Sequence, residues 1–215
     1  MKFVISYSGG KDSILALDSM IADGNEPVAM IVMYNKNAGR SYFHGINLNM
    51  LKRISESLNI PLIKGETSGE DYAQVFEKAL LQSKTLGATA CVFGDIDIEE
   101  HKSWNQNRCD NAGLQAILPL WQQSRALLVK QVIDLNYNCI LKCICDQRIP
   151  KELLGKSLNL EMIDFFERIG VDMCGENGEY HTIVVDGPLF TKKINYTVSD
   201  IIKTEYVSAV DLLIL

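Results

Sequence analysis

The sequence predicts an α/β protein in which an open parallel β-sheet is followed by a smaller α+β region. Three observations indicate this class. A short apolar segment at residues 3–5 passes through two glycines into a helical pattern. Apolar segments of strand length then alternate with helical patterns as far as about residue 121, which is typical of a parallel sheet. Beyond that point the alternation stops. We therefore expect two domains, residues 1–122 and residues 123–215.

The first strand and the first helix are joined by the segment Ser8-Gly9-Gly10-Lys11-Asp12-Ser13. Adjacent glycines let the backbone approach an anion, and the amides and dipole of the next helix favour negative charge. The segment therefore predicts a phosphate-binding loop. Its spacing is not that of a Walker A motif, so a standard P-loop NTPase is excluded. The alternative is an ordinary strand-to-helix turn with a serine cap. The predicted nucleotide-binding residues here are Ser6, Ser8, Gly9, Gly10, Lys11, Asp12 and Ser13.

The second strand, at residues 28–34, is a continuous apolar run and should be buried on both faces. Ligands of such sheets lie beyond the carboxyl ends of the strands, so Met33 is expected to contact adenine, although a core position would also explain it. Residues 35–48 should form a loop over the nucleotide. In that loop His44 is predicted to bind the nucleotide, with a solvent-facing histidine as the alternative.

Two more helix–strand units follow in the first domain. One ends in a short strand at residues 59–63, with residues 65–67 as its exit, and the other in a strand at residues 90–93. Gly94 and Asp95 come directly after this central strand and should lie beside the nucleotide. Asp95 could accept a hydrogen bond from the ribose, help to place Mg²⁺, or cap the next helix.

The second domain has a different pattern. Its predicted elements are a helix at residues 127–133, an alternating strand at residues 139–146, a helix at residues 162–171 and alternating strands at residues 194–215. Cys139, Cys143 and Cys145 should share one face of their strand by period two. No Cys-x-x-Cys pair is present, so we expect small buried hydrophobic side chains, not metal ligands, and free thiols throughout.

A second dense group of polar residues lies at residues 175–182, directly before the apolar strand at residues 183–185. Such a group can line a pocket that faces the nucleotide across the domain junction, with a decorated hairpin as the alternative. Glu179 and His181 could move protons or orient an amine. The predicted substrate-binding residues are Glu176, Asn177, Glu179, Tyr180, His181 and Thr182.

The composition excludes several other classes. The chain has 215 residues and a formal net charge of −6, without a run of basic residues, so a nucleic-acid partner is not expected. No apolar run is long enough to span a bilayer, and residues 1–2 lead directly into the first strand. We therefore expect no membrane partner, no signal peptide and a cytoplasmic location.

Taken together, the motifs resemble those of the diphthine–ammonia ligase family of PP-loop ATP pyrophosphatases over nearly the whole chain. The matching segments are Ser8 to Ser13, Ser41-Tyr42-Phe43-His44, Gly94-Asp95-Ile96, Pro119-Leu120-Trp121 and Cys174 to Thr182. Asn177 replaces a glycine that is common in the family, and asparagine also tolerates positive φ. The resemblance implies a Rossmann-like (HUP-type) sheet with a PP-loop, followed by a substrate-binding domain.

The resemblance also implies a reaction. ATP would adenylate a substrate carboxylate with release of pyrophosphate, and ammonia would then displace AMP to form an amide. The implied catalytic residues are Lys11, Glu176, Glu179 and His181, and Asp12 would help to place Mg²⁺. The implied acceptor is an elongation factor that bears diphthine, with a small carboxylate or another macromolecule as the alternative. A non-catalytic ATP-binding regulatory protein is a further alternative, and a homodimer is conceivable.

Overall fold

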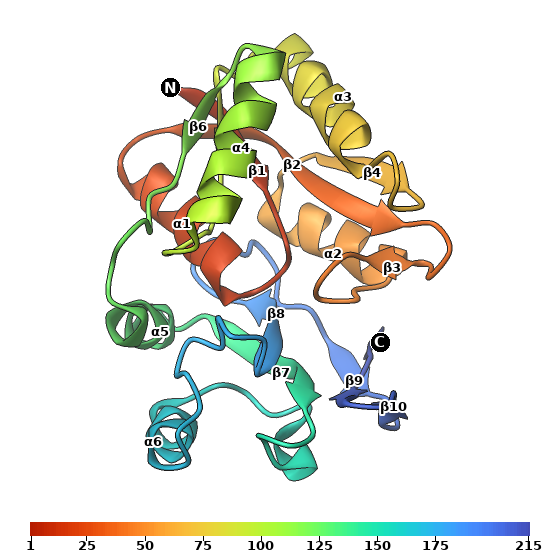
Figure 1. Cartoon of the computed structure of the whole chain (residues 1–215), viewed down its shortest axis with the longest axis vertical. Helices are drawn as coiled ribbons and strands as arrows, with labels where there is room; N and C mark the ends of the chain where they lie inside the picture. Colours follow the sequence, from red (N-terminus) through yellow and green to blue (C-terminus); the bar gives the residue numbers. More distant parts are fainter.

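The computed structural model describes all 215 residues. Two larger β-sheets lie one above the other in Figure 1, with helices and a separate strand pair around them. The helices are α1 (Lys11–Ala22), α2 (Leu48–Leu58), α3 (Tyr72–Thr85), α4 (Glu99–Ala112), α5 (Arg125–Asp134), α6 (Leu160–Arg168) and the 3₁₀ turn η1 (Lys151–Leu153). The strands are β1 (Lys2–Ser6), β2 (Glu26–Asn35), β3 (Arg40–Ser41), β4 (Leu62–Thr67), β5 (Ala90–Val92), β6 (Gln115–Ile117), β7 (Asn138–Cys145), β8 (Tyr180–Asp186), β9 (Tyr196–Val198), β10 (Ile202–Lys203), β11 (Val207–Ala209) and β12 (Leu212–Ile214).

The first sheet has the predicted parallel topology. Its parallel strands lie in the order β4-β2-β1-β5-β6, and the short β3 pairs antiparallel with the end of β2. Helices α3 and α4 pack on one face through a core that includes Phe76 and Cys109. Helices α1 and α2 pack on the other face, in a core that continues into the second sheet. The carboxyl ends of β1, β2 and β5 therefore lie at the edge next to the second sheet (Figure 1).

The second sheet is antiparallel, in the order β10-β11-β7-β8, and β9 and β12 form a separate strand pair. Strand β8 contacts α1, and α5 lies beside α1 as well. One cluster of 42 buried residues joins α1, α2 and the strands β7 and β8 of the second sheet. The second sheet is thus packed firmly against the helix that follows the glycine loop. No helix of the chain combines the length and apolar character needed to cross a membrane.

A β-bulge in β7 corrects the prediction for the cysteines. Leu141 pairs with Thr182 and Cys143 with His181, so Lys142 is an extra residue between them. One inserted residue reverses the alternation of faces. Cys139 therefore points into the large core, whereas Cys143 is only half-buried. The three cysteines do not share a face, and all six thiols in the chain are free.

Two strand boundaries also differ from the prediction. Residues 65–67 belong to β4, although they were predicted to leave the strand. The strand starts late because Asn59 ends α2 in the left-handed conformation, with φ of 54°, and Pro61 follows it. At the second polar group, β8 already begins at Tyr180, so the loop before it is shorter than predicted.

Candidate active site

A cavity of about 610 Å³ lies at the carboxyl ends of the parallel strands, between the first sheet and the start of β8. Most of the predicted site residues line this cavity, namely Ser6, Ser8, Lys11, Asp12, Ser13, Met33, His44, Gly94, Asp95, Glu176, Tyr180, His181 and Thr182. Four predicted residues do not line it, namely Gly9, Gly10, Asn177 and Glu179. The fold therefore brings the two polar groups of the sequence to one place.

Lys11 is the buried cation of the cavity, with a side chain that is only 6% exposed. Its Nζ lies 2.8 Å from Asp12 Oδ2, 3.8 Å from Glu176 Oε1 and 5.5 Å from the centre of the Tyr180 ring. Burial opposes the charge, but the Asp12 carboxylate and the other acidic neighbours outweigh it. The pKa of Lys11 therefore lies well above its usual value, and the ammonium stays charged.

Asp12, Cys174 and Glu176 form an acidic cluster around this ammonium, with one potential ligand atom from each within 4.8 Å of the others. Burial and the nearby Asp12 carboxylate raise the pKa of Glu176 to about 7. Burial also raises the pKa of the Cys174 thiol, so it stays protonated and is a poor ligand. Because Mg²⁺ prefers carboxylate oxygens, and the two carboxylates already surround a cation, Asp12 and Glu176 fit a Mg²⁺ site.

The glycine pair of the phosphate loop makes room for the neighbouring loop. A Cβ atom on Gly9 would lie 2.3 Å from Ile46 Cδ1, and one on Gly10 would lie 2.3 Å from His44 Cε1. Gly9 also has a positive φ of 88°. The pair therefore allows the loop at residues 41–46 to pack directly on the start of α1.

Strand β8 holds the phosphate loop from the other side. The Val184 amide donates to Gly9 O at 2.9 Å, and the Lys11 amide donates to Thr182 Oγ1 at 3.0 Å. One amide of the first helical turn, which was expected to be available to an anion, is thus bound by a hydroxyl of the second sheet. This links the phosphate loop to the strand on which His181 lies.

Two imidazoles lie together in the cavity. The rings of His44 and His181 are 4.8 Å apart between centres, and His44 Nδ1 lies 2.7 Å from Thr182 O. Burial and the neighbouring His181 lower the pKa of His44 to about 3, and burial followed by the charge of Lys11 lowers that of His181. Both rings are therefore neutral at physiological pH.

Glu179 lies behind the cavity wall and organises the loop before β8. Its side chain is buried, and its oxygens accept hydrogen bonds from the backbone amides of Asp172 at 3.3 Å and Asn177 at 3.1 Å. The Asn177 amide group also donates to Glu179 at 3.4 Å. A carboxylate that is engaged in this way fixes loop geometry.

Arg125, the first residue of α5, joins this loop to the first sheet. It donates to Asp97 through Nε and Nη2, both at 2.7 Å, and its Nη1 is paired with Asp172. Asp172 in turn accepts from the backbone amides of Cys174 at 3.0 Å and Glu176 at 3.2 Å. Sequence reasoning missed Arg125, because nothing in its local pattern indicates a contact with either loop.

An aromatic wall on α3, on α4 and directly after β5 was also missed. It consists of Tyr72, Phe76, Phe93 and Trp104, which all line the cavity. The Trp104 ring centre lies 5.2 Å from that of Phe76 and 5.9 Å from that of Tyr72. A signal was present, since these aromatic residues lie in the halves of α3 and α4 that face the carboxyl edge of the sheet or directly after β5.

Asp95 lies beside this wall with both carboxylate oxygens engaged. Asn105 Nδ2 donates to Oδ2 at 2.8 Å, and His101 Nδ1 lies 3.1 Å from Oδ1. Gly94, next to it, packs against the start of α1, where a Cβ would lie 2.8 Å from the carbonyl carbon of Asp12. These partners fix the end of β5 against α4 and the phosphate loop.

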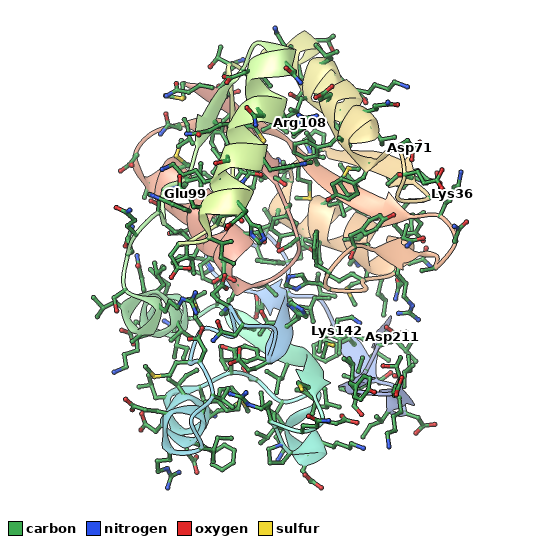
Figure 2. All side chains as sticks on the ribbon, in the orientation of Figure 1. Lys36, Asp71, Glu99, Arg108, Lys142 and Asp211 are labelled. Carbon is green, nitrogen blue, oxygen red and sulfur yellow. The ribbon has the colours of Figure 1, made fainter.

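The loop at residues 41–46 is fastened to the C-terminal strands by an ion cluster that we call the tail clamp: Arg40, Lys142 and Asp211. Arg40 makes a bidentate pair with Asp211 at 2.6 and 2.7 Å, and Lys142 Nζ lies 3.4 Å from Asp211 Oδ1. Figure 2 labels Lys142 and Asp211 next to each other. Lys142, the bulge residue of β7, is only 4% exposed, and burial lowers its pKa.

Comparison with known proteins identifies relatives of this chain. A diphthine–ammonia ligase of Schizosaccharomyces pombe is 25% identical over 94% of this chain, which spans 37% of that protein. A diphthine–ammonia ligase of Danio rerio is 27% identical over 90% of this chain, which spans 86% of that protein.

One solved structure matches this chain at a lower sequence identity than these relatives do. It is described as a predicted subunit of tRNA methyltransferase from Methanocaldococcus jannaschii, and it aligns with a TM-score of 0.47 and 16% identity over 90% of this chain and 100% of its own.

Two family models match nearly the whole chain in succession. The model of the diphthamide synthase N-terminal domain matches residues 1–116, and the model of the diphthamide synthase C-terminal domain matches residues 124–209. The order of the two matches follows the order of the two sheets in the structure. The chain therefore belongs to the diphthamide synthase family.

Proposed function

We propose that the chain is an ATP-dependent amide ligase that adenylates a carboxylate, releases pyrophosphate and transfers the acyl group to ammonia. Family membership supports the use of ATP and the ligase activity. The single observation on which the site assignment depends is the meeting of Lys11, Asp12 and Glu176 in one cavity, with a phosphate loop on one side and the start of β8 on the other.

The phosphate end of the cavity can stabilise the negative charge that develops at the α-phosphate during adenylation. Lys11 provides a charge that is already in place and shielded from water, so little reorganisation is needed during adenylation. Asp12 and Glu176 would hold Mg²⁺, which when bound neutralises phosphate oxygens. The hydroxyls of Ser8 and Ser13 line the same end.

The nucleoside end is assigned to the aromatic wall. Trp104 lines the cavity, and a flat aromatic ring of this kind binds a purine base by stacking. Met33, which also lines the cavity, offers a further apolar contact to the base. Asp95 is already engaged with Asn105 and His101, so we assign it mainly to holding that wall. We revise Glu179 and Asn177 to loop-positioning roles, since neither lines the cavity.

We propose residues 1–122 as the ATP-binding domain and residues 123–215 as the acceptor-binding domain. The gap between the two matched family ranges, at residues 117–123, supports this boundary. The name of the relatives favours diphthine on a protein as the acceptor and ammonia as the nitrogen donor. A small carboxylate is the competing acceptor.

Product analysis tests the proposal. Purified protein is incubated with ATP, Mg²⁺, ammonium and either diphthine-bearing elongation factor or a panel of small carboxylates, and the nucleotide products are separated. We expect AMP and pyrophosphate in a ratio of one to one with the amide. Lys11→Ala should reduce the rate by about 10²-fold or more, and the matched control Lys78→Ala, at an exposed position of α3, should not change it. ADP with orthophosphate would refute the proposal, and ATP binding without turnover would favour the regulatory alternative.

A further inference from the structure

The protonation of His44 is fixed by its contact with β8. Its Nδ1 lies 2.7 Å from Thr182 O, and a carbonyl oxygen only accepts hydrogen bonds, so Nδ1 carries the proton. In a neutral ring the other nitrogen, Nε2, is then an acceptor with a free lone pair. No protein group donates to Nε2, and the residue lines the cavity. His44 therefore offers one unused acceptor to a bound molecule.

The position of this acceptor restricts what it can bind. The ring lies on Gly10 of the phosphate loop, beside His181, and so at the phosphate end of the cavity, whereas the aromatic wall lies on α3, on α4 and directly after β5. A lone pair repels phosphate oxygens, which are themselves acceptors when ionised. The partner must be a hydrogen-bond donor that comes close to the α-phosphate during the reaction.

We propose that His44 binds the ammonia nucleophile, with Nε2 accepting a hydrogen bond from its N–H. This inference rests on the proposed function and replaces the expectation that His44 binds ATP. His181, whose ring nitrogens have no protein partner, lies 4.8 Å away, so the two rings form one wall of the ammonia site. Lys11 and Lys142 are close enough to oppose positive charge on both rings.

The attack of ammonia on the acyl-adenylate does not require His44 to take up a proton. The ammonia lone pair forms a bond to the acyl carbon, the bond between that carbon and the phosphate oxygen breaks, and AMP leaves with the electron pair. One proton leaves the nitrogen for water. Because the pKa of His44 is lowered, this residue positions the nucleophile by accepting a hydrogen bond and does not store the proton.

The substitution His44→Asn tests the proposal. The asparagine amide can still donate to Thr182 O, but it has no acceptor at the place of Nε2. We expect the KM for ammonia to rise about tenfold, as for the loss of one hydrogen bond, while the KM for ATP and the acceptor-dependent exchange of pyrophosphate into ATP stay within about twofold. An unchanged KM for ammonia, or an equal rise in the KM for ATP, would overturn the proposal.

Two further measurements separate the possible failures. Pyrophosphate exchange by the wild-type protein tests adenylation alone, so its absence would contradict the proposed function and not the role of His44. If His44→Asn fails to fold, as judged by its thermal unfolding, His44→Gln is measured in its place. Glutamine can present a carbonyl oxygen near the position of Nε2 and should keep the KM for ammonia within about threefold of the wild type; a tenfold rise in this variant would contradict the proposal.

Discussion

The packing of Gly10 on His44 predicts how much stability the substitution Gly10→Ala should cost. Gly10 has φ of −92° and ψ of 178°, which alanine adopts without strain, so the backbone adds no cost. The new Cβ would lie 2.3 Å from His44 Cε1 and 2.9 Å from Nδ1, whereas ordinary contact begins at 3.4 Å. The ring must therefore move by about 1 Å, which is an overpacking defect of about 1–3 kcal/mol. The movement also disturbs the hydrogen bond to Thr182 O.

A double-mutant cycle with His44→Ala measures this effect. Unfolding in denaturant is followed for the wild type, both single variants and the double variant. We expect Gly10→Ala to cost about 1–3 kcal/mol in the wild type and less than about 0.5 kcal/mol once the imidazole is absent. In a chain of this size each kcal/mol corresponds to about 2–4 °C in Tm. Equal costs in both backgrounds would refute the reasoning, because the clash with the ring would then not be the cause.

Three other predictions concern the remaining contacts. Arg125→Ala should lower stability by about 1–3 kcal/mol and reduce kcat more than it raises the KM for ATP. The control Arg53→Ala, at an exposed ion pair within α2, should leave stability and kinetics unchanged. An unaltered unfolding midpoint for Arg125→Ala would contradict the link between the loops. Trp104→Ala should raise the KM for ATP about tenfold in steady-state kinetics. A change confined to the KM for the acceptor would indicate that the adenine base binds elsewhere. Burial lowers the pKa of His44 to about 3, so protonation of this ring favours the unfolded chain, whereas the raised pKa of Glu176 has the opposite effect on stability. As the pH drops from about 7 to about 5, the Tm of the wild type should therefore fall relative to the Tm of His44→Asn, and a constant difference between the two would be inconsistent with a neutral buried ring.

The sequence was sufficient for features that depend on local pattern. The parallel sheet followed from apolar runs that alternate with helical periods, and the strand predicted at residues 90–93 is β5, Ala90–Val92. Family membership and the ligase assignment, both inferred from short motifs, are confirmed by the family comparison. The site roles stay predictions, although the structure brings most of the named residues into one cavity.

Features that depend on contacts between distant segments were beyond such reasoning. The bulge at Lys142 is visible only from the pairing of β7 with β8, and no residue type marks it in the sequence. The two glycines suggested anion binding, whereas their missing side chains also accommodate Ile46 and His44. Arg125 bridges two loops whose proximity is a property of the assembled sheets.

The tail clamp has a consequence for how substrates enter and leave. Asp211 lies directly before β12 and holds Arg40, at the base of the loop whose next residues cover the phosphate end of the cavity. That loop cannot lift as an independent flap, because the bidentate pair must break or the strand pair of β9 and β12 must move with it. The loop over the phosphate end of the cavity and the C-terminal strands are thereby linked through one ion pair, although 171 positions separate Arg40 from Asp211 in the sequence.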